Sequence, residues 1–202
     1  MDVLINAGGK GTRMGHCGVE KPMQVIGGVP VVGRVVDAMR GASCVDRVLV
    51  SVSPNTVETE RYLCDAGVEV IRTSGDDFMM DMRESFSALD SDYVMVCPSD
   101  MPLLTSEVVD RCASRFKPEM QSMVVMVKAE LVREMGVTPS FSCDVDGTEY
   151  VLSGLSVMDR RATIEGKYLD EHRLLTEFRE LAVNVNTPGE LELARRMCSE
   201  VV

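Results

Sequence analysis

The stretch Val3-Leu4-Ile5-Asn6-Ala7-Gly8-Gly9-Lys10-Gly11-Thr12-Arg13-Met14-Gly15 runs from apolar residues straight into a glycine-rich turn. Its apolar part, residues 3–7, is predicted to be a buried strand. Glycines let the backbone approach a ligand closely, and successive backbone N–H groups in such a turn form a nest for phosphate oxygens. Lys10, Arg13 and the later Lys21 add positive charge. We therefore expect a phosphate-binding loop after the first strand, the alternative being a turn whose cations are merely solvated.

Two common phosphate-binding motifs do not describe this turn. A P-loop has four residues between its glycines, followed by Gly-Lys-Ser/Thr. The dinucleotide-binding fingerprint reads Gly-x-Gly-x-x-Gly, whereas here Met14 stands in the place of the last glycine and Gly15 follows one position later. The loop therefore indicates a different class of nucleotide-binding protein.

Outside the loop, short apolar runs alternate with stretches of helical period. Strands are expected over residues 3–7, 47–53, 68–71, 93–97, 123–127, 150–158 and 181–185, and helices over residues 29–39, 56–65, 77–89, 105–116 and 188–198. This alternation predicts an α/β fold with a mostly parallel sheet, and continuous apolar runs are typical of strands covered on both faces. We expect one domain over residues 1–202, in which residues 128–149 form a flap or an active-site cover.

The clearest amphipathic helix is the one expected at residues 77–89. Its apolar side chains fall on one face of the helix, which predicts that this face is buried. They are Phe78, Met79, Met82, Phe86 and Leu89.

Composition excludes several kinds of partner. The chain has a formal net charge of −11, and because nucleic acids and anionic membranes attract positive surfaces, neither is expected as a partner. No apolar run approaches the length of a membrane span. The seven cysteines are odd in number and include no Cys-x-x-Cys pair, which favours free thiols in a reducing cytoplasm.

Asp100 lies just beyond the strand expected at residues 93–97. Ligands of parallel sheets bind at the carboxyl ends of the strands, where this residue would lie. A carboxylate at that edge suits Mg²⁺ bridging the phosphates of a triphosphate, so Asp100 is the predicted metal ligand. The alternative is a turn residue that caps the helix expected from residue 105.

Two more loops follow predicted strands at the same edge. The first contains Asn55, and the second contains Thr73, Ser74 and Gly75, followed by Asp76. Their side chains or backbone amides would contact the nucleotide base. Ordinary helix capping is the alternative for Asn55 and Asp76.

Three residues of the C-terminal third are further candidates. Gly154 interrupts an apolar strand, which indicates either close approach of a ligand or a bulge. Asn184 and Asn186 would share one face of the last expected strand. We expect Asn186 to serve as a second metal ligand, with an N-cap role for Asn186 or Thr187 as the alternative.

The loop, read as Gly-Gly-x-Gly-Thr-Arg-Met-Gly with the later Glu20-Lys21-Pro22, resembles the signature of the MobA-like nucleotidyltransferase superfamily. Ser99-Asp100-Met101-Pro102 resembles the metal-binding motif of the same family. The resemblance implies an enzyme with a three-layer, Rossmann-like nucleotidyltransferase fold and a mixed, mostly parallel sheet. It also implies Mg²⁺ as cofactor.

Further matches span nearly the whole chain and resemble the archaeal adenosylcobinamide-phosphate guanylyltransferases of cobalamin synthesis. They are Gly18-Val19-Glu20-Lys21-Pro22, Ser53-Pro54-Asn55-Thr56, Thr73-Ser74-Gly75, Ser153-Gly154 and Asn184-Val185-Asn186-Thr187. This resemblance implies GTP and a phosphorylated corrinoid as substrates, with Gly8, Gly154 and one or both asparagines handling GTP. The chain departs from the pattern at His16 and Cys17, which are extra residues, and over residues 128–149, which would contact the corrinoid.

The expected mechanism follows from charge. An acceptor phosphate is already an anionic nucleophile, so catalysis needs positioning and electrostatic stabilisation and no Ser-His-Asp triad. Arg13, Lys21 and Asp100 are the expected catalytic residues: Arg13 holds the β and γ phosphates, Lys21 faces the α-phosphate, and Asp100 holds Mg²⁺. The loop residues that would bind GTP with them are Ala7, Gly8, Gly9, Lys10, Gly11 and Thr12.

Other functions stay open at this point. Guanylyl transfer to the molybdenum cofactor and nucleotidyl transfer to a sugar phosphate are the alternatives within the enzyme class. A regulatory nucleotide-binding module without chemistry is the alternative outside it. The sequence also leaves the oligomeric state open, a homodimer included.

Overall fold

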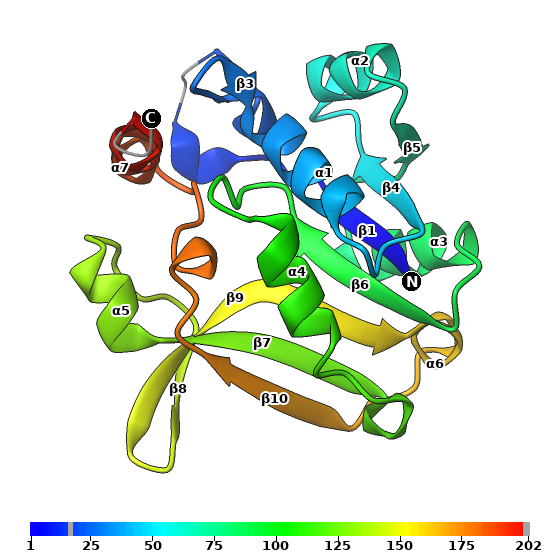
Figure 1. Cartoon of the computed structure of the whole chain (residues 1–202). Coiled ribbons are helices and arrows are strands. Elements are labelled where there is room, and N and C mark those ends of the chain that lie inside the picture. The colour runs from blue at the N-terminus through cyan, green and yellow to red at the C-terminus, as the bar shows by residue number, and fades with distance from the viewer. Residues whose placement is uncertain (16–17, 200–202) are drawn as a thin grey trace.

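The computed structural model describes residues 1–15 and 18–199, so the extra His16 and Cys17 lie outside the described residues. Within these residues, eight strands form one sheet in the order β10-β7-β9-β6-β1-β4-β5, with β8 paired to β9 (Figure 1). The strands of this sheet are β1 (Asp2–Asn6), β4 (Arg47–Val52), β5 (Glu69–Arg72), β6 (Tyr93–Pro98), β7 (Ser122–Lys128), β8 (Ser142–Val145), β9 (Thr148–Asp159) and β10 (Glu171–Thr176). A separate hairpin pairs β2 (Val25–Ile26) with β3 (Val29–Pro30).

The sheet is mixed but mostly parallel. β1 pairs in parallel with β4 and β6, β4 with β5, and β10 with β7. Only β9 among the strands of the main path runs against its neighbours, β6 and β7. The predicted α/β fold with a mostly parallel mixed sheet is confirmed, and the carboxyl ends of β1, β4, β5 and β6 meet at one edge.

Helices cover both faces of the central strands. They are α1 (Val31–Gly41), α2 (Val57–Asp65), α3 (Phe78–Ser87), α4 (Ser106–Ala113), α5 (Ala129–Glu134), α6 (Arg160–Glu165) and α7 (Pro188–Ser199), with short 3-10 turns η1 (Thr12–Met14), η2 (Lys21–Met23), η3 (Pro118–Met120) and η4 (Arg179–Leu181). In Figure 1, α1 and α4 lie in front of the sheet. None of the helices in the described part of the chain is long and apolar enough to cross a membrane.

Side chains of the central strands alternate between two cores. Val3 and Ile5 of β1 pack into the larger cluster with residues of α1 and α4, whereas Leu4 packs into a smaller cluster with Met82 and Phe86 of α3. Both faces of these strands are therefore buried, which explains why they read as continuous apolar runs.

The apolar face of α3 is buried only in part. Asp77 caps the helix by accepting from the backbone amides of Met79 and Met80, and Met82, Phe86 and Leu89 are buried as predicted. Phe78 and Met79 are instead 61% and 49% exposed. The prediction was wrong for this first turn because Phe78 faces a cavity at the sheet edge and not the core.

The C-terminal third differs most from the prediction. Residues 181–185 form no strand; Val183 and Val185 are buried in an irregular segment, where the Val185 amide donates to the Asp100 carbonyl at 2.8 Å. The place beside β7 is taken by β10, whose first residues are exposed and polar, so no apolar run marked it. Residues 128–149 hold α5 and β8, and β8 forms a hairpin with β9.

Candidate active site

The loops that follow β1, β4, β5 and β6 converge at the carboxyl edge of the sheet, as expected for an α/β fold. Lys21 and Asp100, which are 79 residues apart in sequence, form an ion pair of 2.5 Å between Nζ and Oδ2 at the centre of this edge. Their side chains are only 19% and 10% exposed. The same lysine nitrogen donates to Asn186 Oδ1 at 2.8 Å.

Arg13 and Asn184 complete this cluster, which we call the Lys21–Asp100 cluster. Arg13 Nη2 donates to Asn186 Oδ1 at 2.8 Å. Asn184 Nδ2 donates to the second oxygen of Asp100 at 3.0 Å and to the Ser153 carbonyl at 3.3 Å. The five side chains therefore form one hydrogen-bonded network, in which Lys21 contacts Asp100 directly and Arg13 is joined to Lys21 through Asn186.

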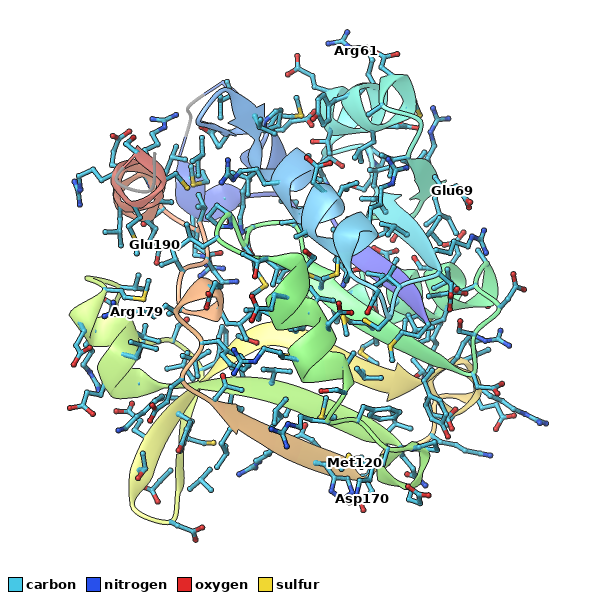
Figure 2. The ribbon with its side chains drawn as sticks, in the orientation of Figure 1. Arg61, Glu69, Met120, Asp170, Arg179 and Glu190 are labelled. Atoms are coloured by element: carbon cyan, nitrogen blue, oxygen red, sulfur yellow. The ribbon has the colours of Figure 1, made fainter. Side chains whose placement is uncertain are left out.

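The segment before α7 supplies the two asparagines. Thr187 Oγ1 accepts from the Glu190 amide, and Glu190 Oε2 accepts from the amides of Asn186 and Thr187 (Glu190 is labelled in Figure 2). This reciprocal capping box makes Thr187 the N-cap. The Asn186 side chain is thus not needed as a cap and contacts the cluster instead.

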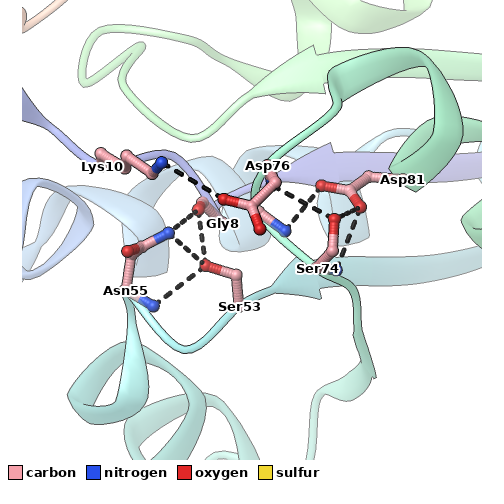
Figure 3. Close-up of polar contacts among 8 residues, drawn as sticks. Gly8, Lys10, Ser53, Asn55, Ser74, Asp76 and Asp81 are labelled. Carbon is pink, nitrogen blue, oxygen red and sulfur yellow. Dashed lines mark hydrogen bonds and ion pairs between the residues drawn. The ribbon is translucent and has the colours of Figure 1, made fainter.

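A second network joins the glycine-rich loop to the loop after β4 (Figure 3). Ser53 Oγ donates to the Gly8 carbonyl at 2.7 Å, and Asn55 Nδ2 donates to the same carbonyl at 3.4 Å and to Ser53 Oγ at 3.1 Å. Asn55 therefore ties two loops together and is not a helix cap. Gly75 lies against this pair with φ of 72°, and a Cβ there would meet Ser53 Oγ at 2.6 Å, so only glycine fits.

The loop after β5 is held by α3. Asp81 accepts from the Ser74 amide at 3.0 Å, from Ser74 Oγ at 2.7 Å and from the Gly75 amide at 2.9 Å. At the rim, Lys10 Nζ pairs with Asp76 Oδ1 at 3.2 Å, and both side chains are mostly exposed (Figure 3). Thr73 is buried and continues the sheet by donating its amide to the Val52 carbonyl.

Two adjoining cavities open at this edge. The smaller, of about 450 Å³, is lined by the glycine-rich loop together with Lys21, Asp100 and Asn186. The larger, of about 830 Å³, is lined by apolar residues of α5 and β9 and by the exposed Phe141. The two cavities share Arg13, Phe78, Pro98, Asp100 and Asn186. One ligand could therefore bind on the glycine-rich loop in the smaller cavity while a second ligand approaches it from the larger, apolar cavity.

Gly154 lies where β9 bulges. Val124 pairs with Ser156 and Met126 with Leu152, so the register shifts around Gly154. Its φ is 92°, and a Cβ there would lie 2.8 Å from Pro98 Cγ. The bulge expected as one alternative is therefore present, and the close neighbour of Gly154 within the protein is Pro98, two residues before Asp100. Gly154 also lines the larger cavity, so approach by a ligand stays a prediction.

The oxygen donors of the Lys21–Asp100 cluster fit Mg²⁺. Asp100 Oδ2 and Asn186 Oδ1 converge on one point, which the Lys21 ammonium now occupies at 2.5 and 2.8 Å. Mg²⁺ prefers oxygen ligands and is usually held by one or two carboxylates plus substrate phosphates. Among the described residues no group of three His, Cys, Asp or Glu side chains could hold a metal alone, so the phosphates would have to complete the coordination.

A thiol nucleophile does not fit this site. Cys97 is fully buried beside it, and burial, helped by the charge of Asp100, raises the pKa of its thiol well above the usual value. The six cysteines of the described residues are all free, as expected.

Sequence reasoning brought the right loops together but missed several residues of the site. Ala7, Gly9, Lys10, Gly11, Thr12, Arg13, Lys21, Asp100 and Asn186 line the smaller cavity, while Gly154 and Asn184 line the larger. Asn55, Thr73, Ser74 and Gly75 line neither of these two cavities and take part in the contacts between loops, so their contact with the base stays a prediction. Phe141 lies in the segment 128–149 that was expected to cover the site, but no motif marked this residue within the segment. Glu20 and Asp81 hold the loops from outside the cavities, and Glu20 could have been found because it belongs to the Glu20-Lys21-Pro22 motif.

Known proteins resemble this chain in sequence and fold. The chain is 31% identical to the adenosylcobinamide-phosphate guanylyltransferase of Methanocaldococcus jannaschii, over 98% of this chain and 97% of that protein. It is 25% identical to a molybdenum cofactor guanylyltransferase of Shewanella baltica, over 100% and 97%. A solved CMP:2-keto-3-deoxy-manno-octonic acid synthetase complexed with CTP superimposes with a TM-score of 0.72 at 15% identity, covering 100% of this chain and 99% of that one.

The family comparison agrees with this site. The MobA-like NTP transferase domain matches residues 3–145, a segment that contains the glycine-rich loop, Lys21 and Asp100. The chain therefore belongs to the MobA-like NTP transferase family and is a nucleotidyltransferase.

Proposed function

We propose that this enzyme transfers GMP from GTP to adenosylcobinamide phosphate, giving adenosylcobinamide-GDP and pyrophosphate. The observation that carries the proposal is the 31% identity, along nearly the full length of both chains, to the adenosylcobinamide-phosphate guanylyltransferase of Methanocaldococcus jannaschii. The family loop alone cannot choose the acceptor, because relatives with other acceptors share it.

The triphosphate would lie in the smaller cavity. Backbone amides of residues 8–12, with Lys10 and Arg13, would bind the β and γ phosphates. Lys21 would leave its ion pair with Asp100 and bind the α-phosphate, while Asp100 and Asn186 hold Mg²⁺. Bound there, the metal would neutralise charge on the phosphates as pyrophosphate leaves.

The reaction exchanges one P–O bond for another. A phosphate oxygen of the acceptor attacks the α-phosphorus of GTP and forms a new P–O bond. The bond between the α-phosphorus and the α–β bridging oxygen breaks, and pyrophosphate leaves with that electron pair. Because the acceptor oxygen is already an anion, the residues need only align it and stabilise the developing charge, and the step needs no general base.

The acceptor would enter from the larger cavity. Its volume of about 830 Å³ and its lining of Val127, Val132 and Val151 suit a large, largely apolar group. Phe141 and Leu152, which also line the cavity and are 79% and 44% exposed, add apolar surface that is open to solvent. A corrinoid ring would rest against this surface while its phosphate reaches the shared residues Arg13 and Asp100.

A substrate panel tests the proposal. Pyrophosphate release should be measured with GTP, CTP and UTP against adenosylcobinamide phosphate, molybdopterin and a hexose phosphate, each with Mg²⁺. We expect turnover with GTP and the corrinoid only. Turnover with GTP and molybdopterin instead would favour the second candidate, which the 25% full-length identity to the Shewanella baltica enzyme supports. Turnover with a sugar phosphate would refute both.

A further inference from the structure

Glu20 binds the first turn of α2 from a distant segment. Its Oε1 accepts from the Glu58 amide at 2.8 Å, and its Oε2 accepts from the Thr59 amide at 2.7 Å and from Thr59 Oγ1 at 2.6 Å. The amide groups of a first helical turn lack partners within the helix and carry partial positive charge. The N-cap of α2, Thr56, makes no side-chain capping bond to this turn, so Glu20 supplies the cap.

The residue that follows Glu20 is Lys21, whose ammonium contacts Asp100 at 2.5 Å and Asn186 at 2.8 Å. The turn η2 begins at Lys21, and the Glu20 carbonyl accepts from the Met23 amide at 2.9 Å. The Lys21 backbone is thus fixed at its N-terminal side by a carboxylate with three partners on a rigid helix. The flexible part of Lys21 is only the four-carbon side chain that reaches the cluster.

From this geometry we propose that Glu20 is a positioning residue for catalysis: by clamping the turn of Lys21 onto α2, it places the Lys21 ammonium at the α-phosphate. This inference rests on the role proposed above for Lys21. Misplacement of a catalytic group by about 1 Å can cost about 100-fold in rate. A loosened turn should therefore lower kcat even though Glu20 lines neither cavity of the site.

The matched comparison is between two carboxylates with the same kind of partners. Asp110 accepts from the amides of Ser43 at 3.0 Å and Cys44 at 2.9 Å, and it lines neither cavity of the site. Glu20→Gln and Asp110→Asn each replace a carboxylate by an amide of similar shape. We expect both to lower Tm by a few degrees, whereas only Glu20→Gln should lower kcat, by about 10- to 100-fold, with the KM for GTP changed by less than about threefold. A Glu20→Gln enzyme with lowered Tm and unchanged kcat would overturn the proposal, since the carboxylate would then be structural only.

A double-mutant cycle separates this proposal from the role of Lys21. If Glu20 acts only through Lys21, Glu20→Gln should have almost no further effect on kcat in the Lys21→Ala background. The same loss in both backgrounds would overturn the positioning role. Unchanged kcat in Lys21→Ala alone would instead refute the proposed role of the lysine. If Glu20→Gln folds poorly, Thr59→Val is the alternative variant, because it removes one of the three contacts of Glu20. The kcat of Thr59→Val should fall in the same direction but by less. A Thr59→Val enzyme with lowered Tm and full activity would count against the proposal.

Discussion

At the scale of single residues, the site is a set of cations that each have a polar partner within the protein. Lys21 has Asp100 and Asn186 as partners, Arg13 has Asn186, and Lys10 has Asp76. Pairing lowers the free-energy cost of bringing these positive charges together. When a triphosphate binds with Mg²⁺, phosphate oxygens would replace these partners.

Lys21→Ala should lower kcat by about 100- to 1,000-fold and the affinity for GTP much less. The physical reason is that in the free protein this ammonium is already bound by Asp100 and Asn186, so its main new interaction is with charge developing in the transition state. Steady-state kinetics and calorimetry with GTP measure the two effects. Lys167→Ala, which removes an exposed lysine paired with Glu165, is the control and should leave both unchanged. Parental kinetics in Lys21→Ala would refute this role.

Gly154→Ala should destabilise the protein by about 1–3 kcal/mol. The new Cβ would lie 2.8 Å from Pro98 Cγ at a φ of 92°, which non-glycine residues rarely adopt. Because Pro98 leads into Ser99 and Asp100, kcat should fall as well. Thermal unfolding and kinetics test this. Gly189→Ala is the stability control, since its nearest neighbour would be 3.9 Å from the new Cβ; equal Tm values for the two variants would contradict the prediction.

At the scale of elements, carboxylates tie helices to loops and turns that are between six and 66 residues away in sequence. Glu20 binds the start of α2, Asp81 of α3 binds the loop after β5, and Asp110 of α4 binds the loop after α1. Such contacts fix where each loop leaves the sheet. The sequence did not predict these contacts. A helical pattern indicates which face of a helix is apolar, but it does not indicate which backbone amide a polar residue on the other face will bind.

The contact made by α4 predicts a pH dependence of stability. Hydrogen bonds from the backbone amides of Ser43 and Cys44 lower the pKa of Asp110 from 3.8 to about 2. A group with a lowered pKa in the folded state stabilises the protein above its unfolded pKa, and that contribution is lost as pH falls. The free energy of unfolding should therefore decrease between about pH 4 and pH 2, and Asp110→Asn should show a flatter profile over the same window. Denaturant unfolding at several pH values measures this; parallel profiles would exclude the contribution.

At the scale of the whole molecule, the fold brings together parts of the chain that are up to 173 residues apart. Parallel strands place their carboxyl ends at one edge, where the glycine-rich loop lies. The irregular segment before α7 brings Asn186 to the same edge, where it contacts Arg13. The protein carries a net charge of −11, yet Lys10, Arg13 and Lys21 gather around one cavity at this edge.

Binding at that edge should raise the stability of the entire chain. A ligand that binds only the folded state at 100 times its Kd adds about 2.7 kcal/mol. For a chain of this size, each kcal/mol raises Tm by about 2–4 °C, so GTP with Mg²⁺ should raise Tm by about 5–10 °C. CTP and UTP at the same concentration should raise it less, and Arg13→Ala should reduce the GTP shift. Absence of a shift with GTP and Mg²⁺ would refute binding at this site.

The sequence alone determined the elements whose signal is local. Residues 3–15 predicted a buried strand followed by a phosphate loop, and the apolar runs predicted most of the sheet, because a strand buried on both faces must be apolar throughout. Motif resemblance predicted the family. The apolar runs did not predict β10, because its first residues are exposed and polar. They also led to a strand being predicted at residues 181–185, where the residues are apolar because they are buried, although they pair with no strand.

Only the tertiary structure decided which polar groups meet. Asp100 beside Lys21, Asn186 beside Arg13 and Glu20 on α2 are pairs separated by 38 to 173 residues. Apolar burial is non-directional and can be read from periodicity, whereas a hydrogen bond needs two atoms within about 3 Å in the right direction. That distance is set by the order and register of the strands, and no local pattern in the chain encodes it.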